Sequence, residues 1–261
     1  MEVVIRQDSR MLGEIAADAV ESLLRRKPGA VLGLATGSSP LTTYDALAAR
    51  CEAGRVSFGQ ARGFTLDEYV GLPADHPQRY RNVIDAAFVS RVDFAPGAVD
   101  GPDGLSTDIP SACTRYEEAI RQAGGVDLQI LGIGTDGHIA FNEPGSSLAS
   151  RTRIKTLTRQ TRLDNARFFD GDINLVPTHC LTQGLGTIME ARHVVLLADG
   201  RSKAEAVHHL VEGPVSAMWP ATILQHHRHV TVLVDDAAAQ RLQLADYYRE
   251  TYDSKPEWQD L

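Results

Sequence analysis

The chain has 261 residues, of which 43% are hydrophobic and 23% are charged. This composition is typical of a globular protein with a sizeable core. The formal net charge of −8 argues against general binding to nucleic acids or anionic membranes, because both are polyanions. The apolar runs are too short to cross a bilayer, and the start of the chain lacks the basic and long apolar regions of a signal peptide. The cysteines are odd in number and widely spaced (Cys51, Cys113, Cys180). They indicate a reducing compartment rather than a disulfide framework, so we expect a cytoplasmic protein.

Strand-like and helix-like stretches alternate along the chain. In chain order, hydrophobic periodicity predicts a strand at 2–6, a helix at 11–26, a strand at 30–35, a helix at about 41–52, a strand at 63–69, a helix at about 112–122, strands at 127–134, 153–158 and 193–199, a helix at 202–211, a strand at 229–235 and a helix at 237–248. Residues 99–110 are rich in Asp, Gly and Pro and are expected to form a surface loop.

This alternation predicts an α/β fold with a mostly parallel open sheet and helices on both faces, a Rossmann-like arrangement. No repeat or low-complexity linker interrupts the sequence, so we expect one domain over residues 1–261. Ligands of open α/β sheets bind beyond the carboxyl ends of the strands. The segments that follow each strand are therefore the candidate functional segments.

The first such segment is Thr36-Gly37-Ser38-Ser39-Pro40. Gly37 allows close approach of the backbone to a ligand, and the following helix start offers free N–H groups to an anion. The hydroxyls of Thr36, Ser38 and Ser39 add donors. The segment lacks the ending of a Walker A loop, and a plain helix N-cap is the alternative interpretation.

Carboxylates and a histidine follow two other strands. Asp67 and Glu68 follow GFTL, the first part of the strand predicted at 63–69, and are either a general base with its neighbour or solvated loop residues. Asp136, His138 and Glu143 lie within the glycine-rich segment after residues 127–134. Their crowding favours acid–base catalysis over a turn-capping role. They lack the spacing of the usual zinc helix motif, so we expect no metal.

Basic residues are concentrated between Arg151 and Arg167. This stretch holds six basic residues and one acid, in a chain that is otherwise acidic. It indicates an anionic ligand or an acidic partner surface, with a solvated basic face as the alternative. Lys203, at the start of a predicted helix, is placed to neutralise a phosphate.

Seven segments together resemble one family, the glucosamine-6-phosphate deaminases of the glucosamine/galactosamine-6-phosphate isomerase group. These segments are LGLATGSSPLTTY (32–44), LDEYVGLP (66–73), GIGTDGHIAFNEP (132–144), SSLASRTRIKTLT (146–158), ARFF (166–169), VPTHCLTQGLGTI (176–188) and SKAEAV (202–207). The resemblance extends from the first strand to about residue 235. One departure is Ser38, which stands where the family usually has glycine.

The resemblance implies a reaction in which glucosamine 6-phosphate and water give fructose 6-phosphate and ammonia, in amino-sugar catabolism. It implies a hydrolase that needs no cofactor. His138 matches the ring-opening residue, with Asp136 and Glu143 as its partners, and Asp67 matches the base that moves the C2 proton. The substrate phosphate is expected on Thr36, Gly37, Ser38, Ser39, Arg167 and Lys203.

The resemblance also implies a mobile lid over about residues 153–182. Some family members are hexamers activated by N-acetylglucosamine 6-phosphate, and others are monomers without that control. The activator-site residues of the regulated type match Ser146, Arg153, Lys155, Thr156 and, near the last helix, Tyr247. We therefore expect a homo-oligomer, a hexamer, with this activator.

Two alternatives stay open from the sequence alone. One is a phosphosugar lactonase on the same fold, and the other is a non-catalytic sugar-phosphate sensor. The presence of both Asp67 and His138 argues against the sensor.

Overall fold

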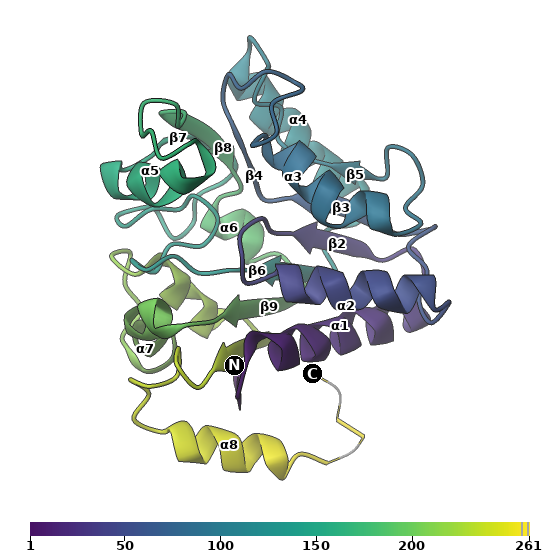
Figure 1. Cartoon of the computed structure of the whole chain (residues 1–261), viewed down its shortest axis with the longest axis vertical. Coiled ribbons are helices and arrows are strands. Elements are labelled where there is room, and N and C mark those ends of the chain that lie inside the picture. The colour runs from purple at the N-terminus through teal and green to yellow at the C-terminus, as the bar shows by residue number, and fades with distance from the viewer. Residues whose placement is uncertain (257, 260) are drawn as a thin grey trace.

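The computed structural model describes residues 1–256, 258–259 and 261, and its centre is a sheet of seven parallel strands (Figure 1). The spatial order of the strands is β1-β10-β9-β6-β2-β3-β5. Their bounds are β1 Glu2–Arg6, β2 Val31–Leu34, β3 Arg62–Thr65, β5 Val99–Asp100, β6 Leu128–Leu131, β9 His193–Ala198 and β10 Val230–Asp235. The inner strands β2, β6 and β9 are buried along their whole length. This explains their continuous apolar sequences, because a parallel sheet is covered on both faces.

Helices flank this sheet on both sides, which confirms the predicted fold class (Figure 1). Their bounds are α1 Ser9–Arg26, α2 Leu41–Glu52, α3 Tyr80–Ala87, α4 Ile109–Gln122, α5 Arg159–Asn165, α6 Leu185–Ile188, α7 Ala204–Glu212 and α8 Ala245–Asp253, with short 3-10 turns at 89–91, 166–168, 201–203 and 220–226. The carboxylate of Asp8 caps α1 by accepting a hydrogen bond from the N–H of Met11 (2.9 Å). No helix in the described part of the chain is long and apolar enough to cross a membrane.

A second sheet corrects the prediction of one continuous strand over residues 63–69. Thr65 pairs with Leu34 in the main sheet, whereas Asp67 pairs with Thr182 in an antiparallel sheet of order β4-β8-β7. The bounds of its strands are β4 Asp67–Tyr69, β7 Arg153–Thr156 and β8 His179–Thr182. The run is a single strand by pattern, but its two halves hydrogen-bond to different partners and so belong to different sheets.

Two further predictions were wrong in their bounds. Residues 99–110 are not one loop, because they include β5 and the start of α4. The last helix begins at Ala245 rather than 237. Turns occupy the residues before it, and the carboxylate of Glu212 accepts hydrogen bonds from the N–H groups of Gln243 and Leu244 (2.8 and 2.9 Å). These bonds satisfy the backbone donors of the two residues just before α8, so Glu212 holds the chain where it enters the helix.

The apolar residues form two cores. The larger one fills the space between the main sheet and its helices. The smaller one lies beneath the segment from β7 to β8 and consists of Tyr69, Leu72, Phe141, Leu157, Ala166, Phe169, Val176 and Cys180. The segment expected to be a lid therefore has its own apolar contacts with β4 and with the loop after β6.

Candidate active site

The candidate site lies where the direction of chain progression across the sheet reverses. β2 and β6 are neighbours, but the chain continues from β2 to β3 on one side and from β6 to β9 on the other. The connections that leave these two strands therefore run in opposite directions, and the carboxyl ends of such a strand pair are the usual ligand site of open α/β folds. These connections begin with residues 35–40 and 132–143, the segments that the sequence singled out.

Three side chains of the loop after β6 meet. His138 Nδ1 lies 2.7 Å from Asp136 Oδ1 and 3.8 Å from Glu143 Oε2. The shorter contact is poorly aligned for a hydrogen bond, so Nδ1 has no hydrogen-bond partner among the described residues. Burial tends to raise the pKa of Asp136, but the contact with His138 and its positive charge outweigh burial and lower this pKa to about 2. Asp136 is thus a carboxylate at neutral pH, suited to stabilise an imidazolium.

Glycines bring this loop together. A Cβ at Gly134 would lie 2.3 Å from His138 Cε1, so only glycine leaves room for the imidazole. Gly137 has a φ of +80°, a conformation that costs glycine little. Ala140 has a φ of +51°, which residues with a Cβ rarely adopt. Such backbone strain persists where the surrounding structure imposes it, as it often does at functional sites.

Asp67 lies across from this loop on β4, and its side chain is buried (6% exposed). Its pairing partner on β8 is Thr182, and the hydroxyl of Thr182 accepts a hydrogen bond from the N–H of Phe141 (3.1 Å). Thr182 therefore contacts both the strand that carries Asp67 and the loop that carries His138, and it holds the two next to each other. Burial, followed by the nearby charge of Glu68, raises the pKa of Asp67 well above its ordinary value.

Glu68 has a structural role instead. Its buried carboxylate accepts hydrogen bonds from three backbone N–H groups, of Tyr69, Tyr80 and Arg81 (2.8–3.0 Å). Two of these donors belong to the first turn of α3. Glu68 therefore ties the start of α3 to β4, and of the two adjacent acids only Asp67 is available for chemistry.

The loop after β2 and the region after β9 face one another. The hydroxyl of Ser39 donates a hydrogen bond to Asp199 Oδ1. Gly37 has a φ of +106°, but Ser38 does not adopt a left-handed conformation, so serine is accommodated there without strain. Helix α2 begins without a side-chain cap. The N–H groups of Leu41 and Thr43 donate to the carbonyls of Ser38 and Pro40 (3.2 and 3.0 Å), so the positive end of the helix dipole rather than a row of free N–H groups would favour an anion here.

Lys203 and Arg167 bring positive charge to this region. Burial lowers the pKa of Lys203, the charge of Asp199 counteracts that shift, and the positive charge of Arg167 adds to it. The charge of Arg167 thus acts on Lys203, although Arg167 comes from the segment between β7 and β8. An anion bound near both cations would counteract this effect.

The expected activator residues are only partly together. Arg153 Nη1 donates a hydrogen bond to Asn142 Oδ1 (3.0 Å), and Asn142 in turn donates to the carbonyls of Ile139 and Gln183. Lys155 and Thr156 follow on β7, and Ser146 is buried with a hydroxyl that has no partner among the described residues. Tyr247 lies apart from them within one chain, because α8 packs on β1 at the far edge of the main sheet (Figure 1).

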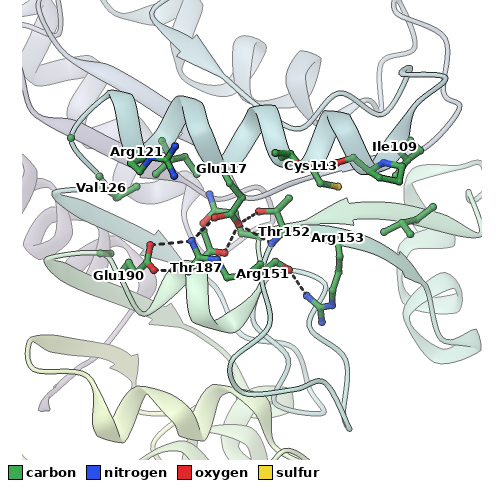
Figure 2. A pocket seen from close by; sticks show the side chains of 18 residues that line it. Ile109, Cys113, Glu117, Arg121, Val126, Arg151, Thr152, Arg153, Thr187 and Glu190 are labelled. Atoms are coloured by element: carbon green, nitrogen blue, oxygen red, sulfur yellow. Dashed lines mark hydrogen bonds and ion pairs between the residues drawn. The ribbon is translucent and has the colours of Figure 1, made fainter.

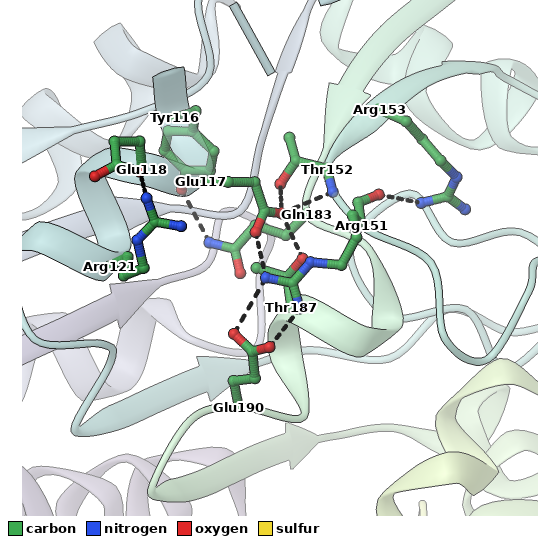
Figure 3. A network of polar contacts seen from close by, with 10 residues as sticks. All are labelled: Tyr116, Glu117, Glu118, Arg121, Arg151, Thr152, Arg153, Gln183, Thr187 and Glu190. Atoms are coloured by element: carbon green, nitrogen blue, oxygen red, sulfur yellow. Dashed lines mark hydrogen bonds and ion pairs between the residues drawn. The ribbon is translucent and has the colours of Figure 1, made fainter. Parts of the chain in front are cut away.

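A cavity of about 1000 Å³ lies beside the candidate site, between α4 and the start of β7 (Figure 2). Its wall is a network centred on Glu117, whose carboxylate accepts hydrogen bonds from Thr152 N (2.8 Å) and Thr187 Oγ1 (2.6 Å) and pairs with Arg151. Figure 3 shows Arg153 at the edge of this network, where its guanidinium donates a hydrogen bond to the carbonyl of Arg151 (3.3 Å). The network fixes the entry of the chain into β7, and the Asp136–His138–Glu143 cluster does not line the cavity.

Sequence reasoning missed some residues that hold the site together. Thr182 anchors the loop after β6, Asn142 links that loop to Arg153, and Thr161 contacts Glu143. Their partners are between 11 and 41 positions away in sequence, and no local spacing signals such contacts.

The side chains of Asp136, His138 and Glu143 could in principle hold a metal ion, because each offers one ligand atom and these atoms lie within 4.8 Å of one another. The ionised carboxylate of Asp136 beside His138 instead favours a role for His138 in acid–base chemistry, with Asp136 as its charged partner.

Comparison with known proteins identifies the family. Residues 7–233 match the family described as glucosamine-6-phosphate isomerases/6-phosphogluconolactonase. The chain belongs to this family. A glucosamine-6-phosphate deaminase of Mycolicibacterium smegmatis is 78% identical, and the match covers all of both chains. A similar enzyme of Beutenbergia cavernae is 73% identical, again over all of both chains.

A solved structure of a monomeric glucosamine-6-phosphate deaminase superposes with a TM-score of 0.90 at 42% identity, covering 92% of this chain and 100% of the other. The expected resemblance is therefore confirmed over the whole chain.

Proposed function

We infer that this protein converts glucosamine 6-phosphate and water to fructose 6-phosphate and ammonia, in amino-sugar catabolism. The observation that carries this inference is the 78% identity to a glucosamine-6-phosphate deaminase over both full lengths. The overall change is an aldose–ketose isomerisation with loss of ammonia, so isomerase/deaminase describes it better than the hydrolase class expected from the sequence.

Ring opening is assigned to His138 with its two carboxylate neighbours. Opening a sugar ring requires a proton to be moved between the C1 hydroxyl and the ring oxygen, and an imidazole does this near neutral pH. Asp136 is ionised, and its Oδ1 lies 2.7 Å from His138 Nδ1. It would stabilise the imidazolium form of His138. Glu143 Oε2, 3.8 Å from the same nitrogen, would be its second partner.

Movement of the C2 proton is assigned to Asp67. A carboxylate buried to this extent is poorly solvated and therefore more basic than an exposed one. The substrate itself carries an ammonium group on C2, and its positive charge would favour the ionised form of Asp67 on binding. Transfer of the proton from C2 to C1 gives the imine at C2, which water converts to the ketone with release of ammonia. The steps are proton transfers, addition of water to the imine carbon and expulsion of ammonia from the resulting carbinolamine, and none of them requires a cofactor.

The substrate phosphate is assigned to Thr36, Gly37, Ser38 and Ser39 together with Arg167 and Lys203. The support is the start of α2, which has no side-chain cap, and the effect of the Arg167 charge on Lys203. Because Arg167 belongs to the segment 153–182, binding of the phosphate would draw that segment toward the loop after β2. This is the basis on which we propose the segment as a lid.

The activator, the hexamer and the cytoplasmic location remain proposals. A site for N-acetylglucosamine 6-phosphate on Ser146, Arg153, Lys155 and Thr156 is supported by the unpartnered hydroxyl of Ser146 and by the contact of Arg153 with Asn142. Tyr247 could join it only from another copy of the chain, which is why this proposal requires an oligomer. The solved relative at 42% identity is monomeric. The oligomeric state of this protein in solution therefore distinguishes an activator site shared between subunits from a monomer without one.

Lactone hydrolysis is the competing function, because the family includes 6-phosphogluconolactonases. The experiment is to supply the purified protein with glucosamine 6-phosphate and, separately, with 6-phosphogluconolactone. We expect ammonia release from the first and no hydrolysis of the second above the spontaneous rate. Lactone hydrolysis without ammonia release would refute the proposed function.

A further inference from the structure

A buried threonine of the lid segment holds one oxygen of Glu143. Thr161 lies on α5 and is 5% exposed. Its hydroxyl donates a hydrogen bond of 2.6 Å to Glu143 Oε1. Glu143 is itself 2% exposed, so water cannot readily replace this donor. Hydrogen bonds to charged groups are among the stronger ones in proteins, and their loss leaves an unsatisfied buried oxygen.

The two oxygens of Glu143 are therefore not equivalent. Oε1 is held by Thr161, whereas Oε2 has no hydrogen-bond partner among the described residues and faces His138 Nδ1 at 3.8 Å. A carboxylate group fixed at one oxygen keeps the other oxygen in a defined direction. Without the bond at Oε1, the group would be free to rotate away from the imidazole.

The direction of the bond is set by a second threonine. Thr158 caps α5 by accepting a hydrogen bond from the N–H of Thr161 (3.1 Å), and its hydroxyl donates to Thr161 Oγ1 (3.0 Å). Because Thr161 Oγ1 accepts from Thr158, its own proton is available for Glu143. The cap that starts α5 thereby also orients the donor on α5.

We propose that Thr161 is a positioning residue that links the place of α5 to the orientation of Glu143 beside His138. This inference rests on the proposed function, in which Glu143 is a partner of His138. Through this link, Glu143 is directed toward His138 only when α5 lies in the position that it has in this structure. A lid displaced from the site would withdraw the donor and leave Glu143 misdirected.

The test compares two substitutions at Thr161 with a matched control. Thr161→Val keeps the shape of the side chain and removes the hydroxyl, and Thr161→Ser restores the hydroxyl. Thr178→Val is the control, because Thr178 is an exposed threonine of the same segment. With glucosamine 6-phosphate, we expect Thr161→Val to lower kcat by about 10- to 100-fold, the range of a lost hydrogen bond to a charged group. KM should change by less than about threefold, because Thr161 acts on Glu143 rather than on substrate.

Thr161→Ser should return kcat to within about threefold of wild type, and Thr178→Val should match wild type in both constants, if loss of this hydroxyl is the cause. Equal slowing by Thr161→Val and Thr161→Ser would overturn the proposal, as would a kcat of Thr161→Val equal to that of wild type. Thermal unfolding of each variant separates a loss of fold from a loss of positioning.

A second measurement asks whether Thr161 acts through Glu143. In a Glu143→Ala background, Thr161→Val should cause little further loss of kcat, because the group that it positions is already absent. A full additional loss in that background would overturn the proposal. A wild-type protein that releases no ammonia would instead refute the proposed function and this inference with it, whereas an active wild type with an unaffected Thr161→Val variant refutes the inference alone.

Discussion

Asp67 and Asp136 are two carboxyl groups of one site with opposite electrostatic surroundings. Burial and the charge of Glu68 raise the pKa of Asp67, whereas contact with His138 lowers that of Asp136 to about 2. Groups whose environments move their pKa values apart can take different roles at one pH. Here the weaker acid is assigned to carry the C2 proton, and the stronger acid is assigned to stay ionised beside the imidazole.

Replacement of the base should separate chemistry from binding. Asp67→Asn keeps the shape of the side chain but cannot accept the C2 proton, so kcat should fall by at least about 100-fold. Binding of glucosamine 6-phosphate, measured by calorimetry, should stay within about tenfold of wild type, since the phosphate contacts are untouched. A variant that turns over at a near-normal rate would remove Asp67 from its role.

The raised pKa of Asp67 also predicts how activity and stability depend on pH. Catalysis needs the ionised carboxylate, so kcat/KM should fall on the acid side at a higher pH than an ordinary aspartate would give. For stability, a folded-state pKa above the unfolded-state pKa means that the folded state holds the extra proton between the two values. The free energy of unfolding therefore decreases as pH rises through that interval.

The comparison that checks this is the melting temperature of wild type and Asp67→Asn across pH. The advantage of Asp67→Asn should be absent below the ordinary carboxyl pKa and should grow as pH rises toward neutrality. An advantage that is constant with pH would contradict a raised pKa.

At the scale of elements, the carboxyl ends of β2, β6 and β9 bring together groups that are far apart in sequence. Ser39 follows β2, His138 follows β6, and Lys203 follows β9. Arg167 joins them from the segment between β7 and β8. The proposed phosphate site thus combines one edge of the main sheet with one residue from the small sheet's connecting segment.

This combination predicts the effect of removing each cation. Lys203→Ala and Arg167→Ala should each weaken binding of glucosamine 6-phosphate by about 1.5–3 kcal/mol, the range of a lost charged hydrogen bond. Arg201→Ala is a matched control, because Arg201 is an exposed cation two residues before Lys203. Binding of unphosphorylated glucosamine should be the same in all three variants. An equal loss for the unphosphorylated sugar would mean that the cations hold the fold rather than the phosphate.

The success of sequence reasoning differed between elements for a physical reason. β9 and β10 are continuous apolar runs, and their observed bounds lie within one residue of the predicted ones. β8 mixes His, Cys, Leu and Thr and was missed, because only its pairing with β4 and β7 makes it a strand. The same holds for the site: the crowding of Asp136, His138 and Glu143 is local and visible in the sequence, whereas the contact of Thr161 with Glu143 depends on the tertiary fold.

At the scale of the whole molecule, the protein has a net charge of −8, although the substrate proposed for its site is also negatively charged. The basic stretch from Arg151 to Arg167 offsets this charge locally. Part of it is neutralised within the fold, because Arg151 pairs with Glu117 and Glu190. Arg167 is exposed, and the remaining cations would favour approach of an anionic sugar.

The activator proposal makes a prediction about assembly and kinetics together. If N-acetylglucosamine 6-phosphate binds at Lys155 across a subunit contact, the protein should be oligomeric in sedimentation and its substrate dependence should be sigmoidal. Added activator should make that dependence hyperbolic and raise substrate affinity roughly 5- to 150-fold. Lys155→Ala should abolish the response and spare turnover at saturating substrate. A monomer with hyperbolic kinetics and no response would contradict the proposal and agree with the solved monomeric relative.

The central claim is that loss of ammonia is coupled to isomerisation of the sugar. Its most direct test is the ratio of products formed by the wild-type protein from glucosamine 6-phosphate, with ammonia and fructose 6-phosphate quantified in the same reaction. The mechanism requires that every C2 amine is lost through a C2 imine, so we expect one fructose 6-phosphate for each ammonia throughout the time course. Ammonia accompanied by an aldose phosphate, or fructose 6-phosphate in the absence of ammonia, would contradict the account.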